Sequence, residues 1–165
     1  MYHIENDTRS DTYVGYSTTL AKRIRQHNGE LKNGANRTKQ GRPWSFGMVL
    51  HFPASWFNKI HALQLEYACQ HIGKRRRPRK RKQKQISLEQ RIDNVLYLCN
   101  KSPQFTMCFP SYDSSNCAHS LSIYVKDDSV DRVTQQFNNV RYWNPRILPL
   151  SALPLQTKQN NIKTK

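Results

Sequence analysis

A block of basic residues in the middle of the chain limits what this sequence can fold into more than any other feature. Residues 74–84 read KRRRPRKRKQK and hold nine Lys or Arg side chains. Such dense like charge repels itself and offers nothing to bury, so it cannot form part of a hydrophobic core. We therefore expect a basic linker at 74–84 that separates a folded domain at 1–73 from a second region at 85–143. Prolines from residue 145 onward and a polar end predict a disordered tail at 144–165.

The charge balance of the whole chain indicates a polyanionic partner. The 165 residues include 27 Lys and Arg against 11 Asp and Glu, a net charge of +16. Without the block, 18 − 11 still leaves +7. Basic proteins gain affinity for nucleic acid because neutralised phosphates release their counterions. Nucleic acid is thus the expected partner, with an acidic substrate or an anionic membrane surface as the weaker alternatives.

Two other classes of protein are disfavoured. No apolar run approaches the roughly 20 residues of a membrane-spanning helix, and the first residues lack the apolar core of a signal peptide. We therefore expect an intracellular protein with no membrane partner. The four cysteines have no CxxC spacing, so we interpret them as reduced thiols rather than zinc ligands or disulfides; they are Cys69, Cys99, Cys108 and Cys117.

The first region has the pattern of a small α+β domain. Turn residues separate expected strands at 2–5 and 12–16, and a third strand fits 46–52. A helix can start at Thr18 or Thr19 and run to His27, and another spans 57–71, where Ile60, Leu63 and Tyr67 recur at helical spacing. The order β-β-α-β-α predicts a three-stranded sheet flanked by helices.

The second region predicts a helix-rich linker. Ser87 and Gln90 have the spacing of a capping box and precede an apolar stripe that runs to Cys99. Strands are possible at 104–109 and 121–125, and a short helix at 130–137 follows.

A few polar residues of the first region stand out chemically. Tyr13 precedes Gly15, where the backbone can approach a ligand. Arg23 and His27 lie four residues apart on one helical face. These two side chains could bind a phosphate, or they could belong to a solvated basic face. Glu66 lies along a largely apolar face, so a buried position would require a cation, either a basic side chain or a divalent metal; the alternative is an ordinary surface residue.

Taken in order, these segments closely resemble the GIY-YIG nuclease superfamily, and within it the SLX-type catalytic subunit of structure-specific DNA endonucleases. The resemblance covers residues 2–71. It rests on a series of short motifs in the family's order: YHI at 2–4, YVG at 13–15, RIRQHNGE at 23–30, GANRTK at 34–39, RPW at 42–44, FP at 52–53 and ALQLEYACQH at 62–71.

This resemblance implies metal-dependent hydrolysis of DNA phosphodiester bonds at 5′ flaps, forks and Holliday junctions, in DNA repair and recombination. It implies that Glu66 holds Mg²⁺ or Mn²⁺. Arg23 and Arg25 fall on the family's phosphate-facing helix, with Arg23 at the scissile phosphate. Tyr2 falls on the residue that activates water, and Tyr13 and His27 on residues that orient it.

The resemblance also implies partners and a place in the cell. We expect a heterodimer with an SLX-type scaffold subunit, a nuclear location, and a member without the family's C-terminal zinc domain, since no cysteine–histidine cluster ends the chain. The basic block resembles a nuclear-import signal. The expected contacts with DNA backbone are Lys22, Arg37, Lys39, Arg42, Lys74, Arg75, Arg76 and Arg77.

Two other functions stay open at this point. One is a catalytically silent, basic DNA-binding module that kept the fold of such a nuclease. The other is an RNA-associated basic protein, which would explain the charge but neither the ordered motifs nor Glu66.

Overall fold

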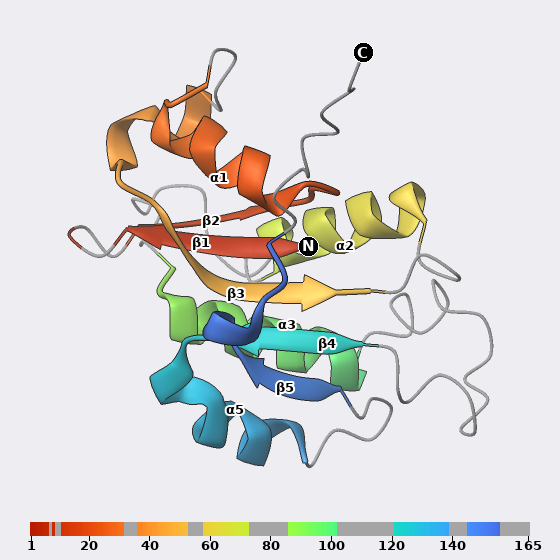
Figure 1. Ribbon diagram of the computed structural model, residues 1–165. Coiled ribbons are helices and arrows are strands. Elements are labelled where there is room, and N and C mark those ends of the chain that lie inside the picture. The colour runs from red at the N-terminus through yellow and green to blue at the C-terminus, as the bar shows by residue number, and fades with distance from the viewer. Residues whose placement is uncertain are drawn as a thin grey trace, which may run out of the picture.

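The strands of both regions form one sheet. The computed structural model describes residues 1–6, 8, 11–31, 36–52, 58–72, 86–101, 121–138 and 145–155. In this part of the chain the sheet has five strands in the order β2-β1-β3-β4-β5 (Figure 1). All neighbours are antiparallel except β4 and β5, which are parallel. The strands are β1 Tyr2–Asn6, β2 Asp11–Gly15, β3 Ser45–His51, β4 Ser122–Val125 and β5 Arg146–Pro149.

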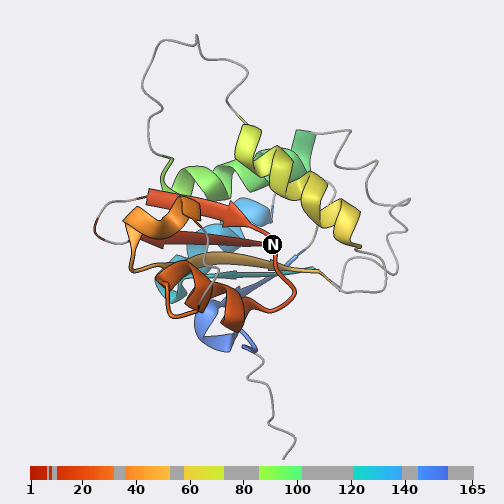
Figure 2. The ribbon, with the colours of Figure 1, turned by 90° about the horizontal axis from the view of Figure 1, so that it is seen from above.

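Helices cover both faces of this sheet. Figure 2, seen from above, has α2 and α3 on one face and α1 on the other. A parallel pair needs a crossover, and α5 supplies it between β4 and β5. The helices are α1 Leu20–Asn28, α2 Lys59–His71, α3 Leu88–Lys101 and α5 Val130–Phe137, and the 3₁₀ turns are η1 Asn36–Gly41, η3 Asp127–Ser129 and η4 Leu150–Ala152.

Each face carries its own hydrophobic cluster because strand side chains alternate. Met48 and Leu50 of β3 join the cluster beneath α2, α3 and α5, whereas Val49 joins the cluster on the α1 side. Ile4 pairs with Phe46 and His3 with Met48, so Gly47 is the extra residue of a β-bulge. A side chain at Gly47 would overlap Leu88 of α3, so glycine allows this helix to lie close to the sheet.

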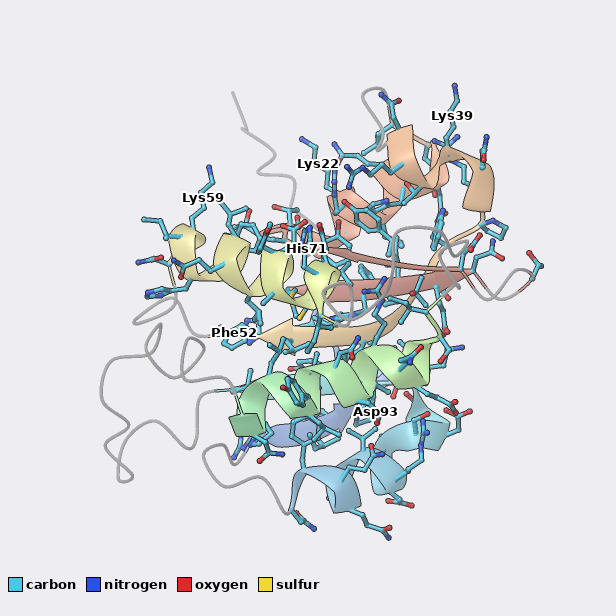
Figure 3. All side chains as sticks on the ribbon, turned by 180° about the vertical axis from the view of Figure 1, so that it is seen from behind. Lys22, Lys39, Phe52, Lys59, His71 and Asp93 are labelled. Atoms are coloured by element: carbon cyan, nitrogen blue, oxygen red, sulfur yellow. The ribbon has the colours of Figure 1, made fainter. Side chains whose placement is uncertain are left out.

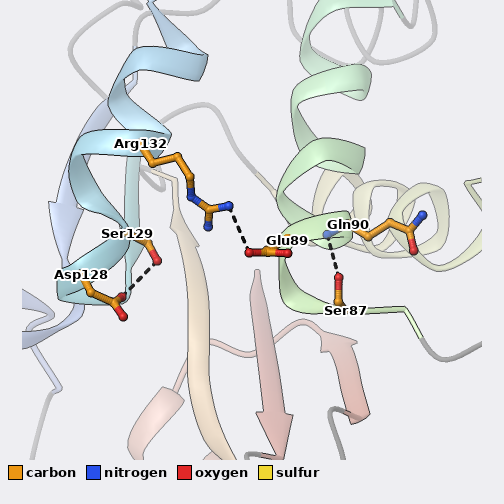
Figure 4. Close-up of polar contacts among 6 residues, drawn as sticks. All are labelled: Ser87, Glu89, Gln90, Asp128, Ser129 and Arg132. Atoms are coloured by element: carbon orange, nitrogen blue, oxygen red, sulfur yellow. Dashed lines mark hydrogen bonds and ion pairs between the residues drawn. The ribbon is translucent and has the colours of Figure 1, made fainter.

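Polar contacts fix α3 at its start and hold it to α5. The backbone N–H of Gln90 donates to Ser87 Oγ at 3.2 Å, which confirms the expected cap (Figure 4). Arg132 of α5 donates to Glu89 at 3.3 Å across the two helices, and Ser129 donates to Asp128 within the turn before α5. The ion pair is exposed, so it orients the helices more than it stabilises them.

The α+β class and the three strands of the first region are confirmed, with the sheet extended by β4 and β5. The expectation of a disordered tail from residue 144 is wrong for residues 146–152, which form β5 and η4. Leu148, Leu150 and Leu153 pack against the α1-side cluster, and proline is tolerated because β5 lies at the sheet edge.

Two expected segments lie outside the described residues: the basic block at 74–84 and the strand at 104–109. Within the described ranges, no helix has the length and apolar character needed to cross a membrane.

Candidate active site

Tyr2 is anchored at the start of the central strand. It pairs with Gly15 of β2 and with Val49 of β3, and it has no exposed surface. Met1 exchanges backbone hydrogen bonds of 2.8 Å with Leu50 and so continues the ladder past Tyr2. A side chain at Gly15 would overlap the Tyr2 hydroxyl, so this glycine provides the space for the phenol. The position of Tyr2 is therefore fixed from both neighbouring strands.

A chain of hydrogen bonds runs from α1 through Tyr2 to η1. Arg23 Nε donates to the Tyr2 hydroxyl oxygen at 2.9 Å, and that hydroxyl lies 2.8 Å from His27 Nε2. On the other side of the ring, His27 Nδ1 lies 2.8 Å from Thr38 Oγ1. The phenol oxygen accepts from Arg23, so its own proton points to His27 Nε2. His27 then carries its proton on Nδ1 and donates it to Thr38.

Burial keeps both Tyr2 and His27 neutral. Burial raises the pKa of Tyr2 to about 12, although the hydrogen bond from Arg23 and the charge of Arg23 oppose this rise. Burial, together with the nearby charges of Arg23 and Arg42, lowers the pKa of His27 to about 4. At neutral pH the pair is a phenol that donates to an unprotonated imidazole nitrogen.

Tyr13 and Arg23 form the more accessible side of this cluster. The Tyr13 ring lies 5.2 Å from the His27 ring, and both Tyr13 and Arg23 are partly exposed. Arg23 also donates through Nη1 to Gln26 Oε1 at 3.0 Å, so its guanidinium is held from two sides. A guanidinium fixed in this way is suited to bind a phosphate.

Glu66 reaches the same end of the sheet from α2. Its Oε1 accepts from Gln70 Nε2 at 2.9 Å, and the same Gln70 nitrogen lies 3.3 Å from the Val14 carbonyl of β2. Burial raises the pKa of Glu66, while the charge of Arg23 and the hydrogen bond from Gln70 act against this rise. A half-buried carboxylate that feels the charge of an arginine can bind a cation.

The donors at this site fit a hard divalent cation held by few protein ligands. The described ranges contain no group of three or more His, Cys, Asp or Glu that could hold a metal. Mg²⁺ usually keeps several waters and binds through one or two carboxylates plus substrate phosphates. Among the described residues of this cluster, Glu66 supplies such a carboxylate, and the charge of Arg23 acts on it.

One family of known proteins matches the part of the chain that holds these side chains. Residues 1–82 match the family described as the GIY-YIG catalytic domain. Residues 1–82 are thus similar to a GIY-YIG catalytic domain. Tyr2, Tyr13, Arg23, His27 and Glu66 all lie within this segment.

Several curated relatives are similar to the chain. A structure-specific endonuclease subunit SLX1 homolog from Cryptosporidium parvum is 46% identical over 61 residues, which are 36% of this chain and 14% of that protein. Structure-specific endonuclease subunit slx1 from Schizosaccharomyces japonicus is 32% identical over 130 residues, 78% of this chain and 44% of that protein. The protein of the same name from Schizosaccharomyces pombe is 42% identical over 71 residues, which are 41% of this chain and 25% of that protein. The chain thus spans less than half the length of these relatives.

The GIY-YIG domain brings together most of the residues expected at the site. Tyr2, Tyr13, Arg23 and His27 form one cluster, with Glu66 close enough to interact electrostatically with it. Arg25 lies apart, since it is exposed and bonded to Glu30 at 2.8 Å.

The basic residues expected to contact DNA fall into three groups. Lys22, Arg37 and Lys39 are exposed, and Lys22 and Lys39 project into solvent from α1 and η1 (Figure 3). Arg42 donates to the His27 carbonyl at 2.8 Å and so also holds the end of α1. Lys74, Arg75, Arg76 and Arg77 lie outside the described residues.

Two positioning residues of the GIY-YIG domain were not singled out from sequence. Thr38 fixes His27, and its carbonyl in turn accepts from Trp44 Nε1 at 2.8 Å. Gln70 fixes Glu66. Both lie inside motifs that carry the family resemblance, but only the spacing of Gln70, four residues after Glu66, is a signal that sequence alone could have used.

Proposed function

We propose that this chain is the catalytic subunit of a structure-specific endonuclease that hydrolyses phosphodiester bonds of branched DNA with a divalent metal, Mg²⁺ or Mn²⁺. The observation that carries the proposal is the convergence of Arg23 and Glu66, from helices on opposite faces of the sheet, at one end of β1 and β2. The names of the relatives, which call them structure-specific endonuclease subunits, support the same function.

Arg23 binds the scissile phosphate in this proposal. Phosphodiester hydrolysis passes through a transition state with more negative charge on the phosphoryl oxygens than the substrate carries. A fixed guanidinium stabilises that charge without reorganising. Tyr2 and Gln26 hold Arg23 in place, so they act as positioning residues.

Glu66 would hold the divalent cation, with Gln70 keeping its carboxylate in place. When bound, such a cation would supply charge neutralisation at the leaving oxygen and would lower the barrier for phosphate-ester cleavage. Glu66 binds a cation only when its carboxyl group is deprotonated. Because burial raises the pKa of Glu66, cation binding is strongest at pH values above that raised pKa.

The two tyrosines have different roles in this proposal. Tyr2 has no exposed surface and a pKa of about 12, so we expect Tyr13, the partly exposed phenol, to contact the attacking water. His27 Nε2 already accepts the proton of the Tyr2 hydroxyl, so His27 orients the cluster. The proton lost by the water passes to solvent on the exposed side of Tyr13.

Cleavage of end-labelled 5′-flap and four-way-junction DNA tests the proposal. We expect nicks near the branch with Mg²⁺ or Mn²⁺ and none with EDTA. Glu66→Gln should abolish cleavage yet keep DNA binding, while Glu89→Gln, an exposed glutamate of α3, should cleave like wild type. No cleavage by wild type, alone or with an SLX-type scaffold subunit, together with tight binding would instead favour a silent DNA-binding module.

The two arginines of α1 give a second test. Arg23→Ala should reduce kcat by roughly 100-fold because it removes a transition-state contact. Arg25→Ala should weaken DNA binding a few-fold at most if its pairing with Glu30 keeps it away from the scissile phosphate. Equal losses of kcat in both variants would contradict this division.

Two further parts of the proposal concern the cell. The basic block at 74–84 supports import into the nucleus, where repair and recombination of branched DNA take place. The word "subunit" in the relatives' names supports a scaffold partner. Replacing the block's lysines and arginines by glutamine should leave a fluorescent fusion in the cytoplasm if the block is the import signal.

A further inference from the structure

An apolar stripe on α2 is exposed to solvent. Ile60 is 64% exposed, Leu63 46% and Tyr67 62%. They follow one another at intervals of three and four residues and so share one side of the helix. The residues of α2 that are buried in the core are Ala62, Leu65 and Cys69, so the stripe is not part of the packing of the domain.

This stripe borders the candidate active site. Leu63 precedes Glu66 by three residues and Tyr67 precedes Gln70 by three, so each lies beside one of the two site residues on the helix surface. The opposite side of α2 is occupied, because Ala68 and Ile72 pack against the cluster that includes α3. A substrate held at Glu66 would therefore meet the stripe.

The aromatic member of the stripe is held in a fixed orientation. The rings of Tyr67 and His71 are stacked, with centroids 4.0 Å apart and an interplanar angle of 22°. His71 Nδ1 donates to the Tyr67 carbonyl at 2.8 Å, which locks the imidazole over the phenol. Figure 3 shows Lys59 and His71 at the two ends of α2. The residues of the stripe lie between them in the sequence. Tyr67 is 62% exposed despite this stack, so its ring is accessible to a planar ligand.

Charge favours nucleic acid as this ligand. The chain runs from the C-terminal end of α2 into the block at 74–84, with nine basic residues, and the net charge is +16. Aromatic side chains beside strong positive charge are typical of surfaces that bind single-stranded nucleic acid, where bases stack and phosphates pair. We propose that Tyr67 stacks on the unpaired bases next to the branch of a DNA substrate, and that Ile60 and Leu63 pack against them. This proposal rests on the proposed function.

Fluorescence of 2-aminopurine tests the stacking directly. The probe DNA is a 5′ flap with 2-aminopurine at the unpaired position nearest the branch, and a continuous duplex of the same sequence is the reference. Both are titrated in EDTA at constant salt, so that no cleavage occurs. We expect wild type to quench the flap probe and Tyr67→Ala to abolish the quench. We also expect the Tyr67→Ala protein to prefer flap over duplex about tenfold less than wild type does, which is the effect of losing one stacked base.

Two variants make the result specific. Tyr67→Phe keeps the ring and should behave as wild type. Tyr97→Ala removes an aromatic side chain that is 50% exposed on α3, away from the site, and should change neither the quench nor the preference. If Tyr67→Ala binds flap and duplex with the wild-type ratio, the inference is wrong.

Other outcomes also decide the question. Equal loss of flap and duplex binding in Tyr67→Ala would assign the stripe to duplex backbone and overturn the inference. A concentration-dependent dimer of wild type that Tyr67→Ala dissociates would assign the stripe to a second copy. Failure of the proposed function appears separately, as absence of metal-dependent cleavage by wild type, because the binding assay needs no cleavage.

Discussion

Thr38 determines which nitrogen of His27 carries the proton. Replacing it with valine keeps the shape but removes the acceptor for Nδ1–H, which is then buried without a partner. We expect Thr38→Val to lower the free energy of unfolding by about 1–3 kcal/mol. It should also reduce cleavage roughly 100-fold, because the imidazole is no longer held in the tautomer that faces Tyr2.

Thr38→Ser is the matched variant, since it restores the hydroxyl. It should recover most of the cleavage and the ¹⁵N chemical shifts of a His27 ring protonated at Nδ1. A Thr38→Val protein with wild-type His27 shifts and activity would show that Thr38 does not position His27.

Gly15 is required because no side chain fits between β2 and the Tyr2 phenol. A Cβ at this position would overlap both the hydroxyl oxygen and the ring carbon of Tyr2 that bears it. We expect Gly15→Ala to shift Tyr2 away from Arg23 and His27, with a stability loss of about 1–3 kcal/mol from overpacking. Cleavage should fall by more than this loss of folded protein explains, as measured by kcat on fully folded enzyme at low temperature. A purely proportional loss would mean that the phenol keeps its position.

At the scale of elements, Gln70 joins α2 to β2 at the site. It donates to Glu66 and lies within hydrogen-bonding distance of the Val14 carbonyl, so it sets the position of the carboxylate relative to the strand that carries Tyr13. Loss of such an outer contact typically costs 10- to 100-fold in metal affinity or activity. Gln70→Leu should therefore raise the Mg²⁺ concentration needed for half-maximal cleavage roughly tenfold.

The control for this prediction is Gln90→Leu, which changes an exposed glutamine of α3 whose backbone N–H caps the start of that helix with Ser87. It should leave the metal dependence unchanged. If Gln70→Leu has the metal dependence of wild type but a lower kcat, Gln70 serves the orientation of β2 rather than the carboxylate.

Periodicity predicted the helices and strands better than it predicted their buried sides. In α2, the spacing of Ile60, Leu63 and Tyr67 matches a helix, yet these residues are exposed and Ala62, Leu65 and Cys69 are buried. Both sets have helical spacing, so only packing against β2 and α3 decides between them. The strand at 146–149 was not predicted, because Pro145 precedes it and Pro149 ends it. Proline stops regular structure in most contexts but is tolerated in a strand at a sheet edge.

At the scale of the whole molecule, folding keeps two histidines neutral among the residues that the structure describes. The pKa of His27 is lowered to about 4, and burial lowers the pKa of His3 well below its usual value. Both ring nitrogens of His3 are buried without a hydrogen-bond partner in the described part of the chain. The unfolded chain binds protons at both residues below about pH 6.5, whereas the folded protein does not. Stability therefore falls as pH decreases from about 6.5 toward 4.

The two histidine protons contribute a slope of about 2.7 kcal/mol per pH unit in the middle of this window. The amino group of Met1, whose pKa burial lowers to about 5, adds to this slope. Glu66 acts in the opposite direction, because its raised pKa lets the folded protein bind a proton before the unfolded chain does. Urea unfolding at pH 7, 6 and 5 measures the slope. His27→Gln should lower the slope by about 1.4 kcal/mol per pH unit, the share of one proton, and Glu66→Gln should steepen it. A stability that is constant from pH 7 to 5 would contradict the buried neutral state of both histidines.

The sheet also makes the GIY-YIG segment dependent on the rest of the chain. Of the 14 buried residues in the larger cluster, six belong to residues 1–72 and eight to residues 86–138, which include α3, β4 and α5. Strand β3 pairs with β4, so a chain that ends at residue 72 exposes a central strand and more than half of this core is missing. We expect residues 1–72 alone to lack a cooperative thermal transition and to bind a hydrophobic dye. Residues 1–155 should unfold as cooperatively as the full chain. A well-dispersed NMR spectrum from residues 1–72 would show instead that the family segment folds independently and that β4 and β5 only extend it.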